Sequence, residues 1–387
     1  SPMPKKEALR LEYLDGLRAV ASLYVVLFHA GVGFNSDSGE LSGAARILCH
    51  LLVFGHDAVA IFIVLSGYCL MLPVARAEGQ LVRGLGSYFA RRAWRILPPY
   101  YATVLGSLLL IALVPVLETR TTTIWADTFP AFGLGPIGTH LLLIHNLYRS
   151  LAHRIDGPLW SVATEWQIYF FFPLLLLPIW RRFGAAQTVL IGFAVGCSLL
   201  WLAPEAADTA ASWYLGLFAL GMCAAGIGFA SRPLEAALRE RVPWGALSVL
   251  LLGLVAIGAT LLIKPWFRHM PVSDTLVGAT TAVCLVHLTK HALRPAQTAR
   301  PLVLRVLESA PLVAVGRFSY SLYLTHLPVV ALLYFGLRRF ALSASSEMLL
   351  LSVLSVPASL LFSYAFFWVF ERRFVGSPAA FFSKRPA

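Results

Sequence analysis

The sequence predicts an all-α, polytopic integral membrane protein: a helical bundle of about ten transmembrane helices with both termini in the cytoplasm. Three observations support this fold class: composition, the length of the apolar runs, and the sidedness of the basic residues. Hydrophobic residues make up 58% of the 387 positions and charged residues 13%, against roughly 45–50% and about 25% in soluble domains. The apolar residues fall in runs of the roughly 20 residues that a helix needs to cross a bilayer.

The expected spans divide the chain into three parts. A transmembrane domain, 13–371, lies between a cytoplasmic N-terminal segment, 1–12, and a cytoplasmic tail, 372–387. The longest connection, 118–159, is rich in Pro, Gly, Thr and aromatic residues, and its apolar stretch is too short to span, so we expect it to be extramembrane or re-entrant. The ten expected spans are 13–34, 57–75, 97–117, 160–180, 185–203, 211–230, 244–263, 272–290, 311–337 and 349–371.

The basic residues fall mainly on one side of these spans. With the N-terminus in the cytoplasm, 21 Lys and Arg residues lie on the cytoplasmic side and 8 on the other, as the positive-inside rule requires. This distribution next to membrane lipids explains the net charge of +12. We therefore expect membrane lipids, and no nucleic acid, as partners. The five cysteines are scattered without a Cys/His cluster, so we expect no metal site. The sequence carries no signal for an oligomeric state.

The first span carries a stripe of polar residues. At about 100° per residue, Asp15, Arg18, Ser22 and His29 fall within about 60° of one another. An ionisable group facing lipid costs several kcal/mol, so the stripe is expected to face the protein interior or a wet cavity. Asp15 and Arg18 lie near the cytoplasmic end and could also form a simple interfacial pair. His29 lies far from either end.

The fourth span contains a carboxylate within the apolar region. Glu165 has Ser161 and Tyr169 four residues to either side, on the same side of a helix. Counted at 1.5 Å per residue from Trp160 at the outer boundary, Glu165 lies roughly 7–8 Å deep, and His29 roughly 12 Å deep. We therefore expect the two groups to share a layer. A purely structural glutamate, paired or protonated, is the alternative.

Two further spans carry polar groups. In GRFSYSLYLTHLP of the ninth span, Ser319, Tyr323 and His326 fall within about 60° of one another. They could face the same cavity, although a helix-packing histidine is an equally good interpretation. In FIVLSGY of the second span, Ser66 and Gly67 permit close helix packing and a polar contact in the core.

Three arginines precede the third span. Arg91, Arg92 and Arg95 stand just before a helix in which Pro98 and Pro99 are expected to mark a break. Positive-inside anchoring explains such a cluster. A phosphate site explains it equally well, because guanidinium groups pair with phosphate oxygens.

Together these stretches resemble the acyltransferase 3 family of integral-membrane acyltransferases. The resemblance implies a ten-helix core that takes an acyl group, usually acetyl, from cytoplasmic acyl-CoA and places it on a hydroxyl of a glycan or other acceptor. It also implies that Arg18 and His29 are essential and that the RRAWR arginines and Glu165 take part. The absence of an added esterase-like domain after Glu371 is expected to make the chain a stand-alone form. The matching stretches, in the family's order over nearly the whole chain, are LEYLDGLRAVASLYVVLFH, AIFIVLSGYCL, YFARRAWRILPPYY, PLWSVATEWQIYF and GRFSYSLYLTHLP.

The expected reaction assigns a role to each candidate residue. His29 is expected to be the general base or a transient acyl carrier, because its ordinary pKa lies near the working pH, with Glu165 as its partner or a second acid/base group. Arg18, oriented by Asp15, and the arginine cluster would hold the phosphates of acetyl-CoA or another acyl-CoA. The cofactor-binding set is Arg18, Arg91, Arg92 and Arg95, and the supporting set is Asp15, Ser66, Trp160, Ser319, Tyr323 and His326.

The acceptor and the reaction class leave alternatives open. A carbohydrate, a glycan or a glycosylated small molecule would fit as acceptor, and Trp125 and Tyr148 of the long connection could stack on sugars or simply lie at the interface. The expected location is the bacterial inner membrane. A transporter or flippase is the main rival, because buried ionisable groups also mark transport pathways. A scaffold for an envelope complex is a weaker interpretation.

Overall fold

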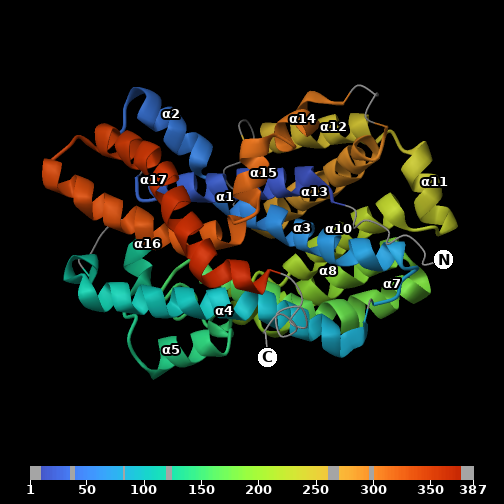
Figure 1. Cartoon of the computed structure of the whole chain (residues 1–387), viewed down its shortest axis with the longest axis horizontal. Helices are drawn as coiled ribbons and strands as arrows, with labels where there is room; N and C mark the ends of the chain where they lie inside the picture. Colours follow the sequence, from blue (N-terminus) through green and yellow to red (C-terminus); the bar gives the residue numbers. More distant parts are fainter. Residues whose placement is uncertain are drawn as a thin grey trace, which may run out of the picture.

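The computed structural model of the chain describes residues 10–34, 40–81, 83–118, 124–259, 270–295 and 300–375. Within these ranges the chain consists of helices and their connections (Figure 1). The α-helices are α1 (Glu12–Gly31), α2 (Gly43–Leu52), α3 (Gly55–Arg76), α4 (Gly84–Leu113), α5 (Leu134–Leu141), α6 (Leu159–Phe171), α7 (Leu177–Phe183), α8 (Ala185–Leu202), α9 (Pro204–Thr209), α10 (Tyr214–Phe229), α11 (Pro233–Arg241), α12 (Trp244–Ile257), α13 (Met270–Ala292), α14 (Leu302–Leu307), α15 (Ala310–Gly316), α16 (Ser319–Leu337) and α17 (Ala344–Phe366).

The predicted multi-pass helical bundle is confirmed. In the described residues, eight helical elements are long and apolar enough to cross a membrane, and the pair α10 and α11, bent by 85°, raises the number to nine. Each of the ten expected spans contains helix, but α12 is an apolar helix of 14 residues, and the last part of its expected span, from residue 260, lies outside the described residues. The placement of both termini in the cytoplasm stays a prediction.

Three helix boundaries differ from the expected ones. The polypeptide forms α2 before the second span, and α4 begins at Gly84, so the three arginines of the cluster lie on this helix. The expected break at Pro98 and Pro99 is wrong, since both prolines lie inside α4. Spanning helices tolerate proline where neighbouring groups satisfy the freed backbone carbonyls. The ninth span is instead broken between Gly316 and Ser319, where α15 ends and α16 begins.

Helix α1 lies in the middle of the bundle and packs against α3, α15, α16 and α17. In Figure 1, α16 and α17 occupy one end of the molecule, and α7, α8 and α11 occupy the other. Helix α3 packs closely on α10: a Cβ on Gly67 would lie 2.1 Å from the Phe218 carbonyl oxygen, and one on Gly221 would lie 2.0 Å from that of Val64. Small residues allow such an approach, which confirms the packing role expected for Gly67.

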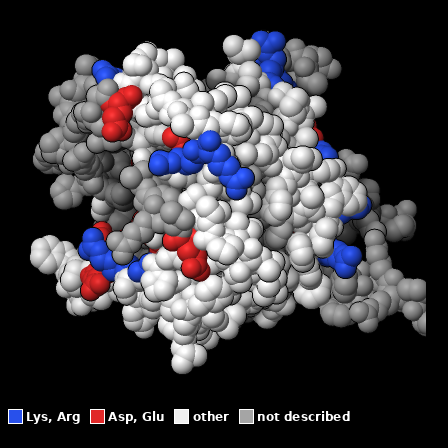
Figure 2. Space-filling model, turned by 90° about the vertical axis from the view of Figure 1, so that its left-hand side faces the viewer, with Lys and Arg blue, Asp and Glu red and all other residues white. Residues whose placement is uncertain are grey.

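The surface is suited to lipid. On the face shown in Figure 2, charged side chains form a few separate groups on a largely neutral surface. Large apolar side chains are exposed on α8 and α12, among them Leu190, Trp201 and Val249. Exposed apolar area on this scale marks contact with a membrane or a partner rather than with water.

The segment 124–158 folds against α4. The Tyr100 hydroxyl donates to the His140 carbonyl oxygen at 3.0 Å, and the Tyr101 hydroxyl donates to that of Leu141 at 2.7 Å. Trp125 is 1% exposed and donates its indole N–H to the Leu117 carbonyl oxygen. The suggestion that Trp125 stacks on sugars is therefore wrong, because its ring is enclosed, whereas Tyr148 is 49% exposed.

Candidate active site

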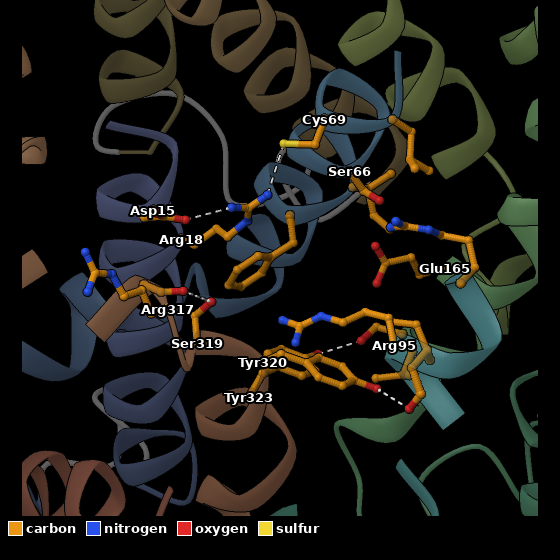
Figure 3. A pocket seen from close by; sticks show the side chains of 18 of the residues that line it. Asp15, Arg18, Ser66, Cys69, Arg95, Glu165, Arg317, Ser319, Tyr320 and Tyr323 are labelled. Carbon is orange, nitrogen blue, oxygen red and sulfur yellow. Dashed lines mark hydrogen bonds and ion pairs between the residues drawn. The ribbon is translucent and has the colours of Figure 1, made fainter. Parts of the chain in front are cut away.

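A cavity of about 620 Å³ opens between α1, α3, α4, α6 and α16, and we call it the arginine cavity (Figure 3). The polar stripe of α1 faces it through Asp15 and Arg18, as the sequence predicted. Its positive charge distinguishes it, because five of its lining side chains are arginines and two are carboxylates. These residues are Arg10, Arg18, Arg92, Arg95, Arg317, Asp15 and Glu165.

Arg18 is held between two partners on one side of the arginine cavity. Its guanidinium donates to Asp15 at 3.1 Å and to the Cys69 sulfur at 3.0 Å (Figure 3). Asp15 also pairs with Arg10 at 3.1 Å. Asp15 therefore contacts two guanidinium groups, and its role in orienting Arg18 for a ligand stays a prediction.

The arginines of α4 separate into two kinds. Arg92 and Arg95 line the cavity, whereas Arg91 donates to Ser87 on its own helix and is not among the lining residues that the structure describes. Arg95 pairs with the fully buried Glu371 at 2.7 Å. Helix α4 therefore presents two of its three arginines to the cavity. Arg91, which was expected to bind phosphate together with them, does not line it.

Two guanidinium nitrogens at this site lack a partner in the described part of the chain. They are Arg92 Nε and Arg95 Nη1, and both are buried. Buried N–H groups are almost always hydrogen-bonded, and an unsatisfied charged donor is costly. The arrangement is suited to an anionic ligand whose oxygens accept from guanidinium groups, such as a phosphate.

Glu165 belongs to the arginine cavity. It accepts a hydrogen bond from the Tyr169 hydroxyl at 2.6 Å, and that hydroxyl lies 3.1 Å from Ser66 Oγ. Ser319 lines the same cavity and donates to the Gly316 carbonyl oxygen at 2.9 Å. The structure thus brings together Glu165, Ser66 and Ser319 with Arg18, Arg92 and Arg95, as candidates from five separate helices.

His29 lines a second cavity, of about 590 Å³, which we call the histidine cavity. Its Nδ1 lies 2.9 Å from the Val25 carbonyl oxygen and 3.1 Å from His326 Nε2. His326 is fully buried, and its own Nδ1 lies 2.7 Å from the Tyr323 carbonyl oxygen. The partner that contacts His29 is therefore His326. Glu165, the partner expected from the sequence, lines the other cavity and bonds to Tyr169.

These contacts fix the proton positions of the neutral histidine pair. A carbonyl oxygen only accepts, so Nδ1 of each ring carries the hydrogen. Nε2 of His326 then accepts from Nδ1–H of His29. The remaining nitrogen of His29, Nε2, keeps a free lone pair and can act as a base or a nucleophile.

The two cavities meet at a thin partition. Val59 and Tyr323 line both of them. The Tyr323 hydroxyl lies 2.6 Å from Ser161 Oγ, which fixes the tyrosine across the boundary. Trp160 lines the histidine cavity, where its ring stacks on His56 at 5.4 Å. The polar stripe of α1 thus serves two cavities, with Arg18 on one side of the partition and His29 on the other.

The segment 124–158 adds a histidine to the histidine cavity. His153 lines it, and burial lowers the pKa of this imidazole, while the Gly157 carbonyl acts in the opposite direction. His153 is consequently neutral near pH 7. In the part of the chain that the structure describes, no three His, Cys, Asp or Glu side chains are grouped so as to hold a metal ion.

Sequence reasoning missed several residues of both cavities. Arg317 lines the arginine cavity, and Glu371, at the end of the last expected span, pairs with Arg95. His56 lines the histidine cavity and contacts the fully buried Asp274 on α13. His56 could have been recognised from the sequence, because it is an ionisable residue at the start of an apolar run. Its contact with Asp274, 218 positions away, could not be predicted from the sequence.

Comparisons with known proteins identify the family of the chain. The family model described as an acyltransferase domain, Acyl_transf_3, matches residues 11–368. The chain is 26% identical over 355 residues to the acyltransferase MdmB of Streptomyces mycarofaciens, a match that covers 85% of this chain and 81% of that protein. It is 27% identical over 168 residues to the putative peptidoglycan O-acetyltransferase YrhL of Bacillus subtilis (strain 168), covering 42% of this chain and 23% of that protein.

No solved structure shows a significant match to the chain. The family model nevertheless spans nearly all of the sequence, including the helices that carry both cavities. The chain therefore belongs to the acyltransferase 3 family and is a multi-pass integral membrane acyltransferase.

Proposed function

We propose that the protein moves an acyl group, acetyl in the first place, from cytoplasmic acyl-CoA to a hydroxyl of a carbohydrate or glycan-type acceptor, in the bacterial inner membrane. The observation that carries this proposal is the pair of adjoining cavities, one lined by His29 and one lined by arginines with N–H groups that find no partner among the described residues. A polyanionic thioester needs the first kind of site, and proton or acyl transfer needs the second.

The arginine cavity would receive the donor. Arg18, Arg92 and Arg95 would pair with the CoA phosphates, and Arg317 adds positive charge to the same cavity. Along α1, Arg18 and His29 are 11 residues apart, which is roughly 16 Å of helix. This separation suits a donor whose phosphates bind at one end and whose thioester reaches the partition at Tyr323. Glu165, hydrogen-bonded to Tyr169, would supply a second acid/base group on the donor side.

The histidine cavity would receive the acceptor. His29 Nε2 would meet the reacting groups there, as general base or as transient acyl carrier, while His326 holds the opposite nitrogen. The name of the Bacillus subtilis relative, a putative peptidoglycan O-acetyltransferase, supports a carbohydrate acceptor. The Streptomyces mycarofaciens relative is named only as an acyltransferase, so a glycosylated small molecule is kept as a second acceptor class.

Purified protein in lipid nanodiscs tests the proposal. Acetyl-CoA consumption, followed as thiol release with and without cell-envelope glycan fractions, should depend on the protein, and mass spectrometry should find acetyl esters on the glycan. We expect His29→Ala to abolish transfer while the protein keeps its melting temperature. Full activity in His29→Ala would contradict the assignment of His29. Acceptor movement across the membrane without thiol release would favour the transporter instead.

A further inference from the structure

The histidine cavity contains a second histidine with an unusual setting. His56, at the start of α3, places Nδ1 3.3 Å from Asp274 Oδ1 and 3.3 Å from the Tyr214 hydroxyl. Its ring stacks on Trp160 with an interplanar angle of 14°. These contacts fix the ring plane and occupy Nδ1. They leave Nε2 as the nitrogen that a ligand in the cavity can reach.

Asp274 explains why this histidine is held. The carboxylate is fully buried, and its second oxygen accepts the Trp213 indole N–H at 2.8 Å. A buried carboxylate needs donors or a positive charge to offset its desolvation. The Nδ1–H of a neutral His56 is such a donor, and the carboxylate would stabilise the imidazolium that forms once Nε2 accepts a proton. A histidine backed by a carboxylate at a cavity is an arrangement suited to accepting a proton.

His29 has different surroundings in the same cavity. Its Nδ1 contacts a neutral imidazole, that of His326, and the Val25 carbonyl oxygen. These partners occupy Nδ1 and leave the lone pair of Nε2 free, and neither of them is a carboxylate. Two histidines of one cavity that have such different partners are candidates for different roles.

We propose that His56 is the base that accepts the proton of the acceptor hydroxyl, and that His29 carries the acyl group between donor and acceptor. Asp274 is the positioning residue of this pair. The inference rests on the proposed function and extends it, because it divides the reaction into two steps and assigns a histidine to each.

The two steps balance in atoms and charge. First, His29 Nε2 bonds to the thioester carbonyl carbon, the C–S bond breaks, CoA leaves as the thiolate, and the Nδ1 proton passes to His326 Nε2. Second, the acceptor hydroxyl gives its proton to His56 Nε2 while its oxygen bonds to the carbonyl carbon. The C–N bond breaks, and His29 recovers its Nδ1 proton from His326. His56 then releases its proton to water, and this proton balances the thiolate charge.

Two nucleophiles that differ in their need for a base separate the two roles. Water requires a base to attack an acyl group at neutral pH, whereas hydroxylamine attacks without one. Thiol release from acetyl-CoA by the purified full-length protein would be measured with each nucleophile, after subtraction of the rate without protein. The ratio of the two rates reports on the base alone, since both reactions share the same donor and the same acyl carrier.

We expect His56→Gln to lower the water-dependent rate by about 100-fold, within the range for loss of a general base, and to leave the hydroxylamine-dependent rate within about threefold. Asp274→Asn should lower the water-dependent rate by about 10-fold with the same selectivity, because its lost charge acts through His56. His29→Gln should abolish both rates. His291→Gln, on the same helix as Asp274 but outside both cavities, should change neither.

Several outcomes would overturn the assignment of His56. Equal losses with both nucleophiles in His56→Gln would indicate a general structural role, and an unchanged water-dependent rate would show that another group is the base. Melting temperature and gel-filtration profile of each variant identify protein that has not folded, and Asp274→Asn then provides the milder test. A wild-type protein that releases no thiol with either nucleophile would contradict the proposed function itself.

Discussion

Single side chains determine the charge of the arginine cavity. Asp15 pairs with Arg18, and Glu371 pairs with Arg95. Each carboxylate therefore neutralises part of the positive charge of the cavity. The groups left over are the unpartnered N–H of Arg92 and one nitrogen of Arg95, as far as the described residues extend. The affinity of the cavity for an anion therefore depends on a small number of donors, and it can be tested one residue at a time.

Arg92→Gln should weaken donor binding. Loss of charge-assisted hydrogen bonds, worth about 1.5–3 kcal/mol each, predicts a rise in KM for acyl-CoA of about 10- to 100-fold with a smaller change in kcat. Initial rates of thiol release at varied acyl-CoA concentration measure it. Arg182→Gln is the matched control, since Arg182 lies outside both cavities and should leave KM unchanged. An unchanged KM in Arg92→Gln would contradict the donor site.

The sequence predicted side-chain positions best where all of the polar residues concerned lie on one helix. The wheel of α1 was sufficient to predict that Asp15, Arg18 and His29 face inward, since a polar stripe in lipid is energetically excluded. It could not identify His326 as the partner of His29, because the two residues are 297 positions apart. The same holds for His56 and Asp274. Contacts of this kind depend on how the helices pack, which hydrophobic periodicity does not encode.

At the scale of helices, the depth of a residue in the membrane was not enough to predict which cavity its side chain lines. Counting residues from the boundary placed Glu165 and His29 in one layer, yet they line different cavities. Height along a helix axis says nothing about lateral position, and the partition at Tyr323 lies between the two groups. Similarly, Pro98 and Pro99 predicted a break that α4 does not have, while the break that exists follows Gly316.

The contact between α3 and α10 predicts a strong effect of one methyl group. In Gly67→Ala the added Cβ would lie 2.1 Å from the Phe218 carbonyl oxygen, so the helices must separate. We expect a loss of about 1–3 kcal/mol in stability, seen as a lower melting temperature in detergent. Gly106→Ala, where nothing lies within 4 Å of the new Cβ, should be neutral or slightly stabilising. Equal melting temperatures for both variants would contradict the packing.

The segment before α6 carries a pH-dependent contribution to stability. Burial raises the pKa of Asp156 from its ordinary value of 3.8 to about 8, against the hydrogen bond from Ser107. The folded state therefore keeps this proton up to about pH 8, while the unfolded chain loses it near pH 4. Stability from this group is present at low pH and is lost as the pH rises through this interval.

Asp156→Asn should remove that dependence. The neutral amide cannot ionise, so the variant should gain stability relative to wild type as the pH rises from 5 to 8, the pH range that we would use for thermal unfolding. Asp208→Asn, at an exposed position, controls for the general loss of an acid and should show no such trend. A constant difference in melting temperature between Asp156→Asn and wild type across the range would show that Asp156 is ionised when folded.

At the scale of the whole molecule, composition and run length were sufficient to predict a multi-pass bundle. They could not separate a span from a bent pair such as α10 and α11, because apolar length alone does not reveal an 85° turn. The orientation in the membrane rests on the distribution of Lys and Arg and predicts that the arginine cavity opens towards the cytoplasm.

Cysteine labelling tests this orientation. In a background with the five native cysteines replaced by alanine, Gln80→Cys, between α3 and α4, should be protected from a membrane-impermeant maleimide in intact spheroplasts. Glu205→Cys, on α9, should react, since the two positions are expected on opposite sides and both side chains are exposed. Lysed membranes should label both. Labelling of Gln80→Cys alone in intact spheroplasts would invert the topology.

The partition formed by Val59 and Tyr323 has a consequence for the cell as well as for the reaction. With the predicted orientation, these two side chains separate a cavity open to the cytoplasm from the histidine cavity, and a charge that leaked across the membrane there would be driven by about 2.3 kcal/mol per 100 mV. In the proposed reaction the acyl group crosses this boundary as a covalently held fragment, so the transfer needs no open path for protons or ions. The size of the Tyr323 side chain would then bear on the membrane potential as well as on the reaction.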